Sequence, residues 1–279
     1  EILARGTDSR IHRSTGAGWE ALTGLDTSVI DVRSDLDCAG SPSTVHLVAL
    51  GTSPAGAFLH ARGLGATYNA WEQEYPSAQL TSTPSIAAFP GFDASYFYGY
   101  VLTGFPQAAH YNPSGGSTDV SPPLAGRVTS APDLWMTVQP RQNLSLFAAF
   151  NADGELTVGV HDNNAFNPPM WHESTVPAPS ARSFEHSPSV CALADATTAL
   201  SAHLFVVASG QIYHAVGGVP FPVSFSTWEL VASNVVRSAP DCTVTADGQA
   251  HVVALSAAGT VLLFEGNTGS WAMQDLGLF

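Results

Sequence analysis

The sequence contains no lysine: its 9 basic residues are all arginines, and they face 23 acidic residues, which gives a formal net charge of −14. Nucleic acids and anionic membranes are bound through clustered cations, so neither is an expected partner. Long apolar runs are lacking too, because none approaches the roughly 18 residues that a membrane span needs. We therefore predict no nucleic-acid binding and no membrane insertion.

Cysteine is also scarce. Cys38, Cys191 and Cys242 are too few, and odd in number, for a disulfide framework. One bridge is compatible with this count, and whether Cys191 and Cys242 meet across adjacent repeats is left open. The sequon that begins at Asn143 and the lack of lysine favour a secreted or extracellular protein.

The motifs of several enzyme classes are missing. The sequence has no G-x-S-x-G, no H-E-x-x-H, no P-loop, no Asp box of the sialidase type and no calcium loop. Carboxylates are sparse, whereas a glycosidase needs two of them about 5 to 10 Å apart. We expect no catalytic residue, no cofactor and no metal ion.

The chain does contain a repeat. Strand-like runs of alternating apolar residues, broken every eight to twelve residues by turn formers, cover nearly the whole sequence, and helical periodicity is nearly absent. A start motif of the Ser/Thr-x-Pro kind recurs in steps of 48, 48, 56 and 52 residues, at 33–38, 81–86, 129–134, 185–190 and 237–242. A strand that ends in a turn is predicted after it at 44–51, 144–151, 202–209 and 250–256. Such periodicity indicates an array of similar units.

Histidine and tryptophan mark the later part of each unit. The predicted third strand carries His12, His60, His110, His161 and His214, and Phe264 takes this place in the sixth unit. The predicted last strand starts with a tryptophan in all units but the third: Trp19, Trp71, Trp171, Trp228 and Trp271. Each unit therefore has four short strands in about 50 residues.

A four-stranded unit cannot bury both of its faces alone, so it must stack against copies of itself. This predicts a single all-β domain over 1–279, a six-bladed β-propeller of four-stranded antiparallel blades. The blades cover approximately 1–25, 26–76, 77–125, 126–176, 177–233 and 234–279. The first blade starts at its second strand and lacks the innermost strand in this chain. We expect upstream residues to supply that strand; the alternative is a three-stranded first blade.

The stretch LARGTDSRIHRSTGAGWEAL at 3–22, with RVTSAPDL at 127–134 and RSAPDCTV at 237–244, resembles the repeat of the bangle-type β-propeller lectins. In that family a Ser-Ala-Pro motif precedes a turn with an aspartate, then Leu-x-His, then a tryptophan motif. The resemblance implies sugar pockets, often for fucose or methylated sugars, between neighbouring blades. The sequence departs from the family in having six units rather than seven, and in lacking tryptophan in the third unit and histidine in the sixth.

We predict that the repeated histidines and tryptophans bind carbohydrate, because imidazole can donate to a sugar hydroxyl and indole can stack on a pyranose. The predicted site residues are His12, Trp19, His60, Trp71, His110, His161, Trp171, His214, Trp228 and Trp271. The alternative is that they hold strands or blades together. A further aromatic cluster places Tyr96, Tyr98 and Tyr100 on one strand face.

Two other polar registers are predicted to be structural. His46, His203 and His251 lie in the second strand, spread around the ring rather than converging as zinc ligands do. Asp37, Asp133 and Asp241 begin the innermost strands, where they could hold a cation near the axis or cap the strand. We favour the cap.

The predicted function is that of a lectin with several weak sugar sites between neighbouring blades, which act through multivalency. Glycans or glycoproteins are the expected partners, and homo-oligomerisation is left open. The alternatives are a propeller glycoside hydrolase or lyase that uses the loops at 161–173 and 216–229, and a protein-interaction propeller without a small ligand.

Overall fold

The computed structural model of the chain describes residues 1–279 except 1, 7, 16, 32–35, 41–43, 53–54, 74–79, 89–95, 103–104, 113–115, 121–125, 139–142, 163–170, 180–182, 195–199, 220–223, 234–235 and 279. Within this part, regular structure is almost entirely β-strand, with one 3-10 turn at Thr27–Val29. No helix among the described residues is long and apolar enough to cross a membrane.

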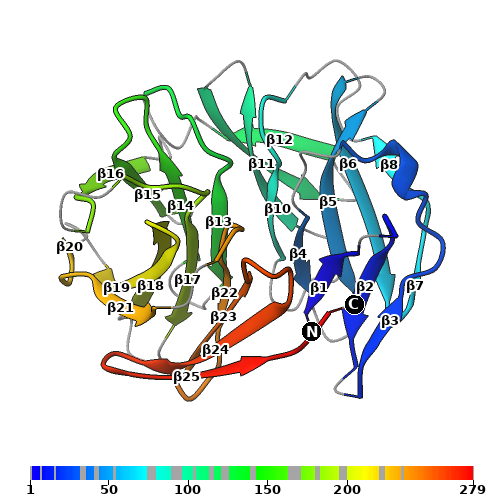
Figure 1. The fold of residues 1–279 in the computed structure, drawn as a ribbon. Coiled ribbons are helices and arrows are strands. Elements are labelled where there is room, and N and C mark those ends of the chain that lie inside the picture. The colour runs from blue at the N-terminus through cyan, green and yellow to red at the C-terminus, as the bar shows by residue number, and fades with distance from the viewer. Residues whose placement is uncertain are drawn as a thin grey trace. The chain divides into compact units, whose positions relative to one another are not determined.

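The strands form six antiparallel sheets that follow one another along the chain (Figure 1). Sheet 1 has the order β1 (Leu3–Arg5), β2 (Ile11–Ser14) and β3 (Trp19–Ala21). Sheet 2 has the order β4 (Asp37–Gly40), β5 (Val45–Thr52), β6 (Ala55–Leu64) and β7 (Thr67–Tyr68), with β8 (Glu72–Gln73) also paired to β6. Sheet 3 consists of β9 (Ser85–Ala88), β10 (Tyr96–Leu102), β11 (Phe105–Asn112) and β12 (Gly116–Val120).

The other three sheets repeat this pattern. Sheet 4 consists of β13 (Asp133–Val138), β14 (Asn143–Phe150), β15 (Leu156–Asp162) and β16 (Trp171–Val176). Sheet 5 consists of β17 (Ser189–Ala194), β18 (Leu200–Ala208), β19 (Gln211–Val219) and β20 (Ser224–Phe225), with β21 (Glu229–Ala232) also paired to β19. Sheet 6 consists of β22 (Asp241–Val244), β23 (Ala250–Leu255), β24 (Val261–Asn267) and β25 (Ser270–Asp275).

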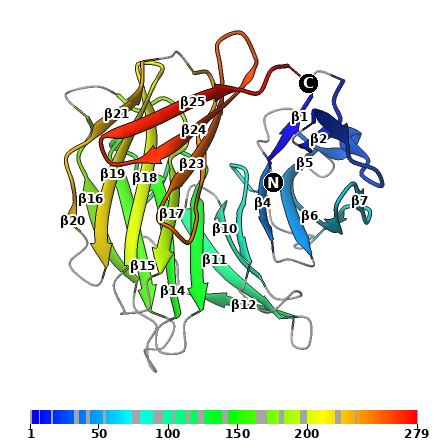
Figure 2. The same ribbon diagram turned by 90° about the horizontal axis from the view of Figure 1, so that it is seen from below.

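The chain divides into two compact units. One contains Glu1–Pro122 and Phe279, with sheets 1 to 3, and the other contains Pro123–Leu278, with sheets 4 to 6. In the second unit the innermost strands β13, β17 and β22 lie side by side in chain order (Figure 1, Figure 2). The prediction of an all-β chain with six repeated sheets, the first lacking its innermost strand, is confirmed. The prediction of a single domain stays a prediction.

Apolar side chains fill the spaces between consecutive sheets within each unit. One buried cluster joins sheets 2 and 3, with Phe58 and Tyr100 in ring contact at 6.5 Å. Similar clusters join sheets 1 and 2, 4 and 5, and 5 and 6. Both faces of an inner sheet are therefore apolar, as the stacking argument requires. Tyr100, one of the three tyrosines expected on a common strand face, is part of this core; the side chains of Tyr96 and Tyr98 lie outside the described residues.

The repeated start motif anchors the loop before an innermost strand. Ser130 Oγ donates to the Ala131 carbonyl at 2.9 Å and accepts from the Phe150 N–H at 2.9 Å, at the end of β14. Ser238 makes the equivalent bond to the Leu255 N–H, at 2.8 Å, in sheet 6. Serine suits this place because its hydroxyl both donates and accepts. The motif therefore supplies the same backbone anchor in sheets 4 and 6.

Two carboxylates link neighbouring sheets through their innermost strands. Asp133 Oδ1 accepts from the Leu134 N–H at 2.7 Å, and its Oδ2 accepts from the Val190 N–H of β17 at 2.6 Å. Asp37 likewise accepts from its own strand at 2.7 Å and from the Ile86 N–H of β9 at 2.8 Å. The strand-cap interpretation is confirmed for these two residues. Each carboxylate also joins one sheet to the next.

Replacing Asp133 by alanine should lower the free energy of unfolding by about 2 kcal/mol, because bonds to an ionised group contribute about 1.5–3 kcal/mol. Urea unfolding followed by tryptophan fluorescence measures this change. The control Asp153→Ala removes the same charge from an exposed turn and should cost less than about 0.5 kcal/mol. Equal losses in the two variants would show that the link through Asp133 does not stabilise the fold.

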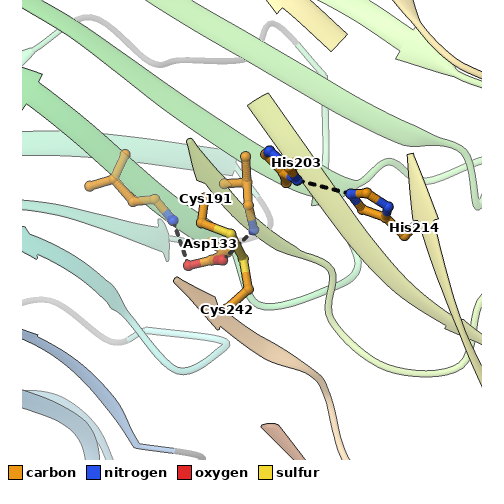
Figure 3. The surroundings of a disulfide bond; sticks show 7 residues. Asp133, Cys191, His203, His214 and Cys242 are labelled. Carbon is orange, nitrogen blue, oxygen red and sulfur yellow. Dashed lines mark hydrogen bonds between the residues drawn. A yellow bond between two sulfur atoms is a disulfide. The ribbon is translucent and has the colours of Figure 1, made fainter. Parts of the chain in front are cut away.

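A disulfide links the innermost strands of another pair of neighbouring sheets, sheets 5 and 6. Cys191 of β17 and Cys242 of β22 are bonded, with their Cα atoms 5.9 Å apart, close to Asp133 (Figure 3). The pairing that the sequence left open therefore forms across adjacent sheets. It closes a loop of 51 residues within the second unit.

Candidate functional site

The predicted site residues lie where the repeat places them. The third-strand histidines are found in β2, β6, β11, β15 and β19: His12, His60, His110, His161 and His214. The tryptophans lie in or just before the outermost strands: Trp19, Trp71, Trp171, Trp228 and Trp271. The side chains of His110, His161 and Trp171 lie outside the described residues. So does most of the loop at 161–173, one of the two considered for an enzyme.

The tryptophans, although they share one sequence motif, occupy different registers against the third strand. Trp171 pairs directly with His161. Trp71 and Trp228 instead precede the glutamates that face His60 and His214. Trp19 pairs with Ser14, two residues after His12, and Trp271 pairs with Gly266, two residues after Phe264. A single role for all five tryptophans is therefore excluded by geometry, since neighbouring registers point to opposite faces of a sheet.

In sheet 5 the histidine register is part of a buried hydrogen-bonded chain. His203 Nδ1 and His214 Nε2 are 3.0 Å apart, and their rings are stacked at 5.1 Å (Figure 3). His214 Nδ1 bonds to Glu229 Oε1 at 2.7 Å. His214 is 0% exposed, so its ring has no surface open to a ligand. Sheet 2 repeats the pair, with His46 Nδ1 3.0 Å from His60 Nε2.

Glu229 extends this chain to the next sheet. Its Oε1 accepts from Trp271 Nε1 at 3.1 Å, and its Oε2 accepts from the Gly269 N–H at 2.7 Å. The Trp271 ring also meets His214 edge-on, with ring centroids 5.1 Å apart. The repeated Trp-Glu pattern thus supplies, at sheets 5 and 6, a bond between the outermost strands.

Burial governs the protonation of this network. Burial, and then the proximity of His214, lowers the pKa of His203 to about 4. Burial also lowers the pKa of His214, although Glu229 opposes this shift. Burial alone would raise the pKa of Glu229, but hydrogen bonds from His214, Trp271 and Gly269 hold it below its usual value. Both histidines are therefore neutral at neutral pH, beside an ionised Glu229.

The innermost carboxylates have a different electrostatic setting. Part of the Asp241 surface is exposed to solvent, but many protein atoms surround its carboxylate. Desolvation by these atoms, and then the charge of Asp133, raises the pKa of Asp241 to about 7. In the part of the chain that the structure describes, no three His, Cys, Asp or Glu side chains lie close enough to hold a metal ion.

The boundary between sheets 1 and 2 presents an exposed polar group. Arg13 of β2 and Glu20 of β3 face each other, with Arg13 Nη2 and Nε at 2.8 and 3.0 Å from Glu20 Oε2. Their side chains are 26% and 46% exposed. Arg13 shares a strand face with Ile11, which packs in the core common to both sheets. The ion pair is therefore turned toward sheet 2.

Sheet 2 contributes the β6–β7 turn to the same boundary. A Cβ atom on Gly65 would lie 3.4 Å from Arg13 Nη1, and the preceding Leu64 is 58% exposed. The Thr23 N–H donates to the Ala66 carbonyl at 2.8 Å, which holds the segment after β3 against this turn. The structure thus brings a charged pair and an exposed apolar side chain together.

Trp71 packs into the core beneath this boundary, and its buried Nε1 makes no hydrogen bond to the described part of the chain. Trp228 occupies the equivalent place in sheet 5, where its Nε1 donates to the Pro177 carbonyl at 2.6 Å. A buried donor without a partner costs about 1–3 kcal/mol. Trp71 therefore retains a hydrogen-bonding capacity that Trp228 uses within the protein.

Sequence reasoning did not single out Arg13, Glu20 or Leu64. Glu20 follows Trp19 just as other glutamates follow Trp71 and Trp228, and the sequence does not show which residue faces it across the hairpin. The signal that could have found them lies in RIHRSTGAGWE: a short hairpin between two strands pairs residues of opposite charge across its turn.

No protein-family model matches the sequence, and no curated protein shows significant similarity to it. Solved structures do match. AofleA from Arthrobotrys oligospora aligns with a TM-score of 0.73 at 12% identity, over 99% of this chain and 82% of that one. Aleuria aurantia lectin, described as a six-bladed β-propeller with a novel fucose recognition mode, aligns with a TM-score of 0.65 at 11% identity, over 98% and 88%.

The chain is a six-bladed β-propeller. A lectin from Burkholderia pseudomallei aligns with it as well, with a TM-score of 0.63 at 14% identity, over 97% of this chain and 78% of that one. The resemblance to propeller lectins is confirmed at the level of the fold. Six blades were expected to depart from a family of seven, but Aleuria aurantia lectin has six as well, so the count is no departure from this neighbour.

Proposed function

We propose that this propeller is a carbohydrate-binding lectin with several weak sugar sites between neighbouring blades. The observation that carries the proposal is the Arg13–Glu20 pair beside Leu64, above the unsatisfied indole N–H of Trp71. Lectins with the same fold add support, one of them described by its fucose recognition. We therefore propose fucose or a related deoxy sugar as the ligand.

The boundary between the first and second blades offers the groups that such a sugar requires. The guanidinium supplies donors and the carboxylate supplies acceptors for neighbouring hydroxyls, and charge-assisted bonds are the stronger kind. A deoxy sugar carries a methyl group, for which Leu64 is an apolar contact. Trp71 Nε1 is buried, so we propose that the side chains around it move when the sugar binds and that it then donates to a sugar hydroxyl.

The other predicted residues stay part of the proposal with different roles. His60 and His214 bond within their blades, so we propose that they position neighbouring groups rather than touch the sugar. Direct contact is proposed for the partly exposed His12 and Trp19. It also remains proposed for His110, His161 and Trp171. Trp228 and Trp271 use their indole N–H groups within the protein, so we propose that they support the sites without donating to the sugar.

Several weak sites act together only when a glycan surface meets more than one of them, because linked sites raise avidity without any new contact. Glycoproteins are therefore the proposed partners, and a homo-oligomer would multiply the sites further. The disulfide supports an oxidising setting. We propose that the protein acts outside the cell.

Arg13→Gln and Trp71→Phe should each abolish one sugar site or weaken it at least about tenfold. This is the loss of affinity expected when a charge-assisted hydrogen bond or a buried donor is removed. Calorimetry with methyl fucoside measures the number of sites and their affinity. Trp71→Phe keeps the aromatic ring and deletes only the N–H. A glycan array identifies the sugar first.

Two matched controls sharpen this test. Arg62→Gln removes an exposed arginine of the same unit and should leave the sugar sites intact. Trp228→Phe deletes an indole N–H that bonds Pro177, so it should lower stability and leave sugar binding unchanged. Wild-type stoichiometry and affinity in both Arg13→Gln and Trp71→Phe would contradict the proposed site.

A further inference from the structure

A buried hydroxyl at the start of the innermost strand of sheet 5 has no hydrogen-bond partner. Ser189 begins β17 and is 1% exposed, and its Oγ makes no hydrogen bond to the described part of the chain. Asp37 and Asp133 hold the same place in β4 and β13, and each carboxylate accepts from the innermost strand of the next sheet. Buried polar side chains are normally hydrogen-bonded, so the Ser189 hydroxyl indicates a place for a further ligand.

The disulfide shows the direction of the Ser189 side chain. Side chains alternate along a strand, so Ser189 and Cys191 lie on the same face of β17. Cys191 is bonded to Cys242, the second residue of β22, so this face is turned toward β22. The Ser189 hydroxyl is therefore directed toward the start of β22, where Asp241 precedes Cys242.

Two carboxylates lie at the same ends of the neighbouring strands. Asp133 Oδ2 accepts from the N–H of Val190, the residue after Ser189, at 2.6 Å, so this carboxylate lies at the start of β17 (Figure 3). The Asp241 carboxylate accepts from the N–H that follows it, at the start of β22. Because β13, β17 and β22 lie side by side, their first residues bring together two carboxylates and one hydroxyl.

The electrostatics of this place favour a positive ion. Desolvation, and then the charge of Asp133, raises the pKa of Asp241 to about 7. A cation between the two carboxylates would offset both effects. Asp241 is exposed to solvent, so an ion can reach it, and its carboxylate is free to move and admit the ion to the Ser189 hydroxyl.

We propose that Asp133, Ser189 and Asp241 form a binding site for calcium. Calcium takes about six to eight oxygen ligands in a flexible geometry, so water can complete a set of two carboxylates and a hydroxyl. Three acidic, histidine or cysteine ligands are not required, because the hydroxyl is the third ligand. The expectation of no metal ion, drawn from the sequence, changes for this place alone. The inference does not depend on the proposed sugar binding.

Terbium luminescence tests both the site and its position, because terbium replaces calcium at oxygen sites and emits when a nearby tryptophan is excited. Trp135 shares a strand face with Asp133 and packs against the cluster that contains Cys191. Terbium should therefore emit when bound to the wild type, and calcium should displace it with a dissociation constant of about 10⁻⁴–10⁻³ M, as at extracellular sites. Trp135→Phe should lose most of this emission, while calorimetry shows that calcium binding is kept.

Variants of the ligands separate this site from general attraction of cations to an acidic protein. Asp241→Asn should weaken calcium binding at least about tenfold and Ser189→Ala about fivefold, because affinity depends on the charge and number of the ligands. Both replacements are close in size to the original residue, and circular dichroism checks that both variants fold. Asp153→Asn removes the same charge from an exposed turn and should bind calcium like the wild type.

Several results would overturn the proposal. The wild type could fail to bind calcium, or terbium emission could persist in Trp135→Phe, which would place the ion elsewhere. Equal calcium affinities of Asp241→Asn and Asp153→Asn would show that only the net charge attracts the ion. Wild-type affinity in Ser189→Ala would show that the buried hydroxyl is not a ligand.

Discussion

Replacing both Cys191 and Cys242 by alanine is expected to lower the thermal unfolding midpoint of this protein by about 10 °C. Closing a loop of 51 residues removes enough conformational freedom from the unfolded chain to stabilise the native state by about 4 kcal/mol. For a chain of this size, each kcal/mol shifts the midpoint by about 2–4 °C. Differential scanning calorimetry of the oxidised protein and the double variant measures the difference.

The disulfide does not act alone, and this determines the controls. Glu229 of sheet 5 accepts hydrogen bonds from Trp271 and Gly269 of sheet 6, so these two sheets stay linked when the disulfide is removed. The double variant should therefore keep its strand content in circular dichroism. Cys38→Ala changes the same residue type outside the bridge and should leave the midpoint within about 2 °C of wild type. A double variant as stable as Cys38→Ala would show that the bridge adds nothing.

The six sheets could be predicted from the sequence because each depends on local information. The apolar alternation of 144–151 and 202–209 gave strands β14 and β18 nearly to the residue, and Gly154 and Gly210, both with positive φ, mark the turns that follow. The repeated serine at 130 and 238 gave the phase of the repeat, because its hydroxyl anchors the loop before the innermost strand in sheets 4 and 6.

The candidate site could not be predicted in the same way, because it depends on register and not on composition. Trp71 and Trp271 read alike in the sequence, yet one leaves its indole N–H unbonded in the described structure while the other donates to Glu229 of the preceding sheet. A one-residue slip between strands exchanges the two faces of a sheet. The pairing of β19 with β21 shifts by one residue between Ile212 and Tyr213, and no pattern in the sequence predicts this shift.

Because of such differences in register, the glutamates at two blade boundaries have different hydrogen-bond partners. At sheets 5 and 6, Glu229 accepts from His214, Trp271 and Gly269, so its hydrogen-bonding capacity is used within the protein. At sheets 1 and 2, Glu20 has Arg13 as its partner, and both side chains are partly exposed. The same Trp-Glu motif, in two different registers, therefore links two sheets at one boundary and leaves partly exposed polar groups at another. We expect the sugar sites to be fewer than the blades.

Acidification from pH 7 to pH 4 should lower the free energy of unfolding by about 3 kcal/mol through His203 alone. Its pKa is about 4 in the folded protein and 6.5 when unperturbed. Between these values the unfolded chain binds a proton that the folded chain does not, so stability is complete above pH 6.5 and is lost as pH falls toward 4. His214, with a lowered pKa, acts in the same direction, and Glu229 adds to the loss when it is protonated below its usual range.

Urea unfolding at a series of pH values between 4 and 8 measures this loss, and the repeat itself suggests the variant to compare. Phe264 stands in sheet 6 where His214 stands in sheet 5, and it is fully buried. The double variant His203→Gln, His214→Phe should therefore fold and show a shallower dependence of stability on pH. His251→Gln, which removes a partly exposed histidine paired with Glu265, should keep the wild-type slope. If the double variant and wild type lost stability in parallel down to pH 4, protonation of the buried pair would not be what limits this propeller in acid.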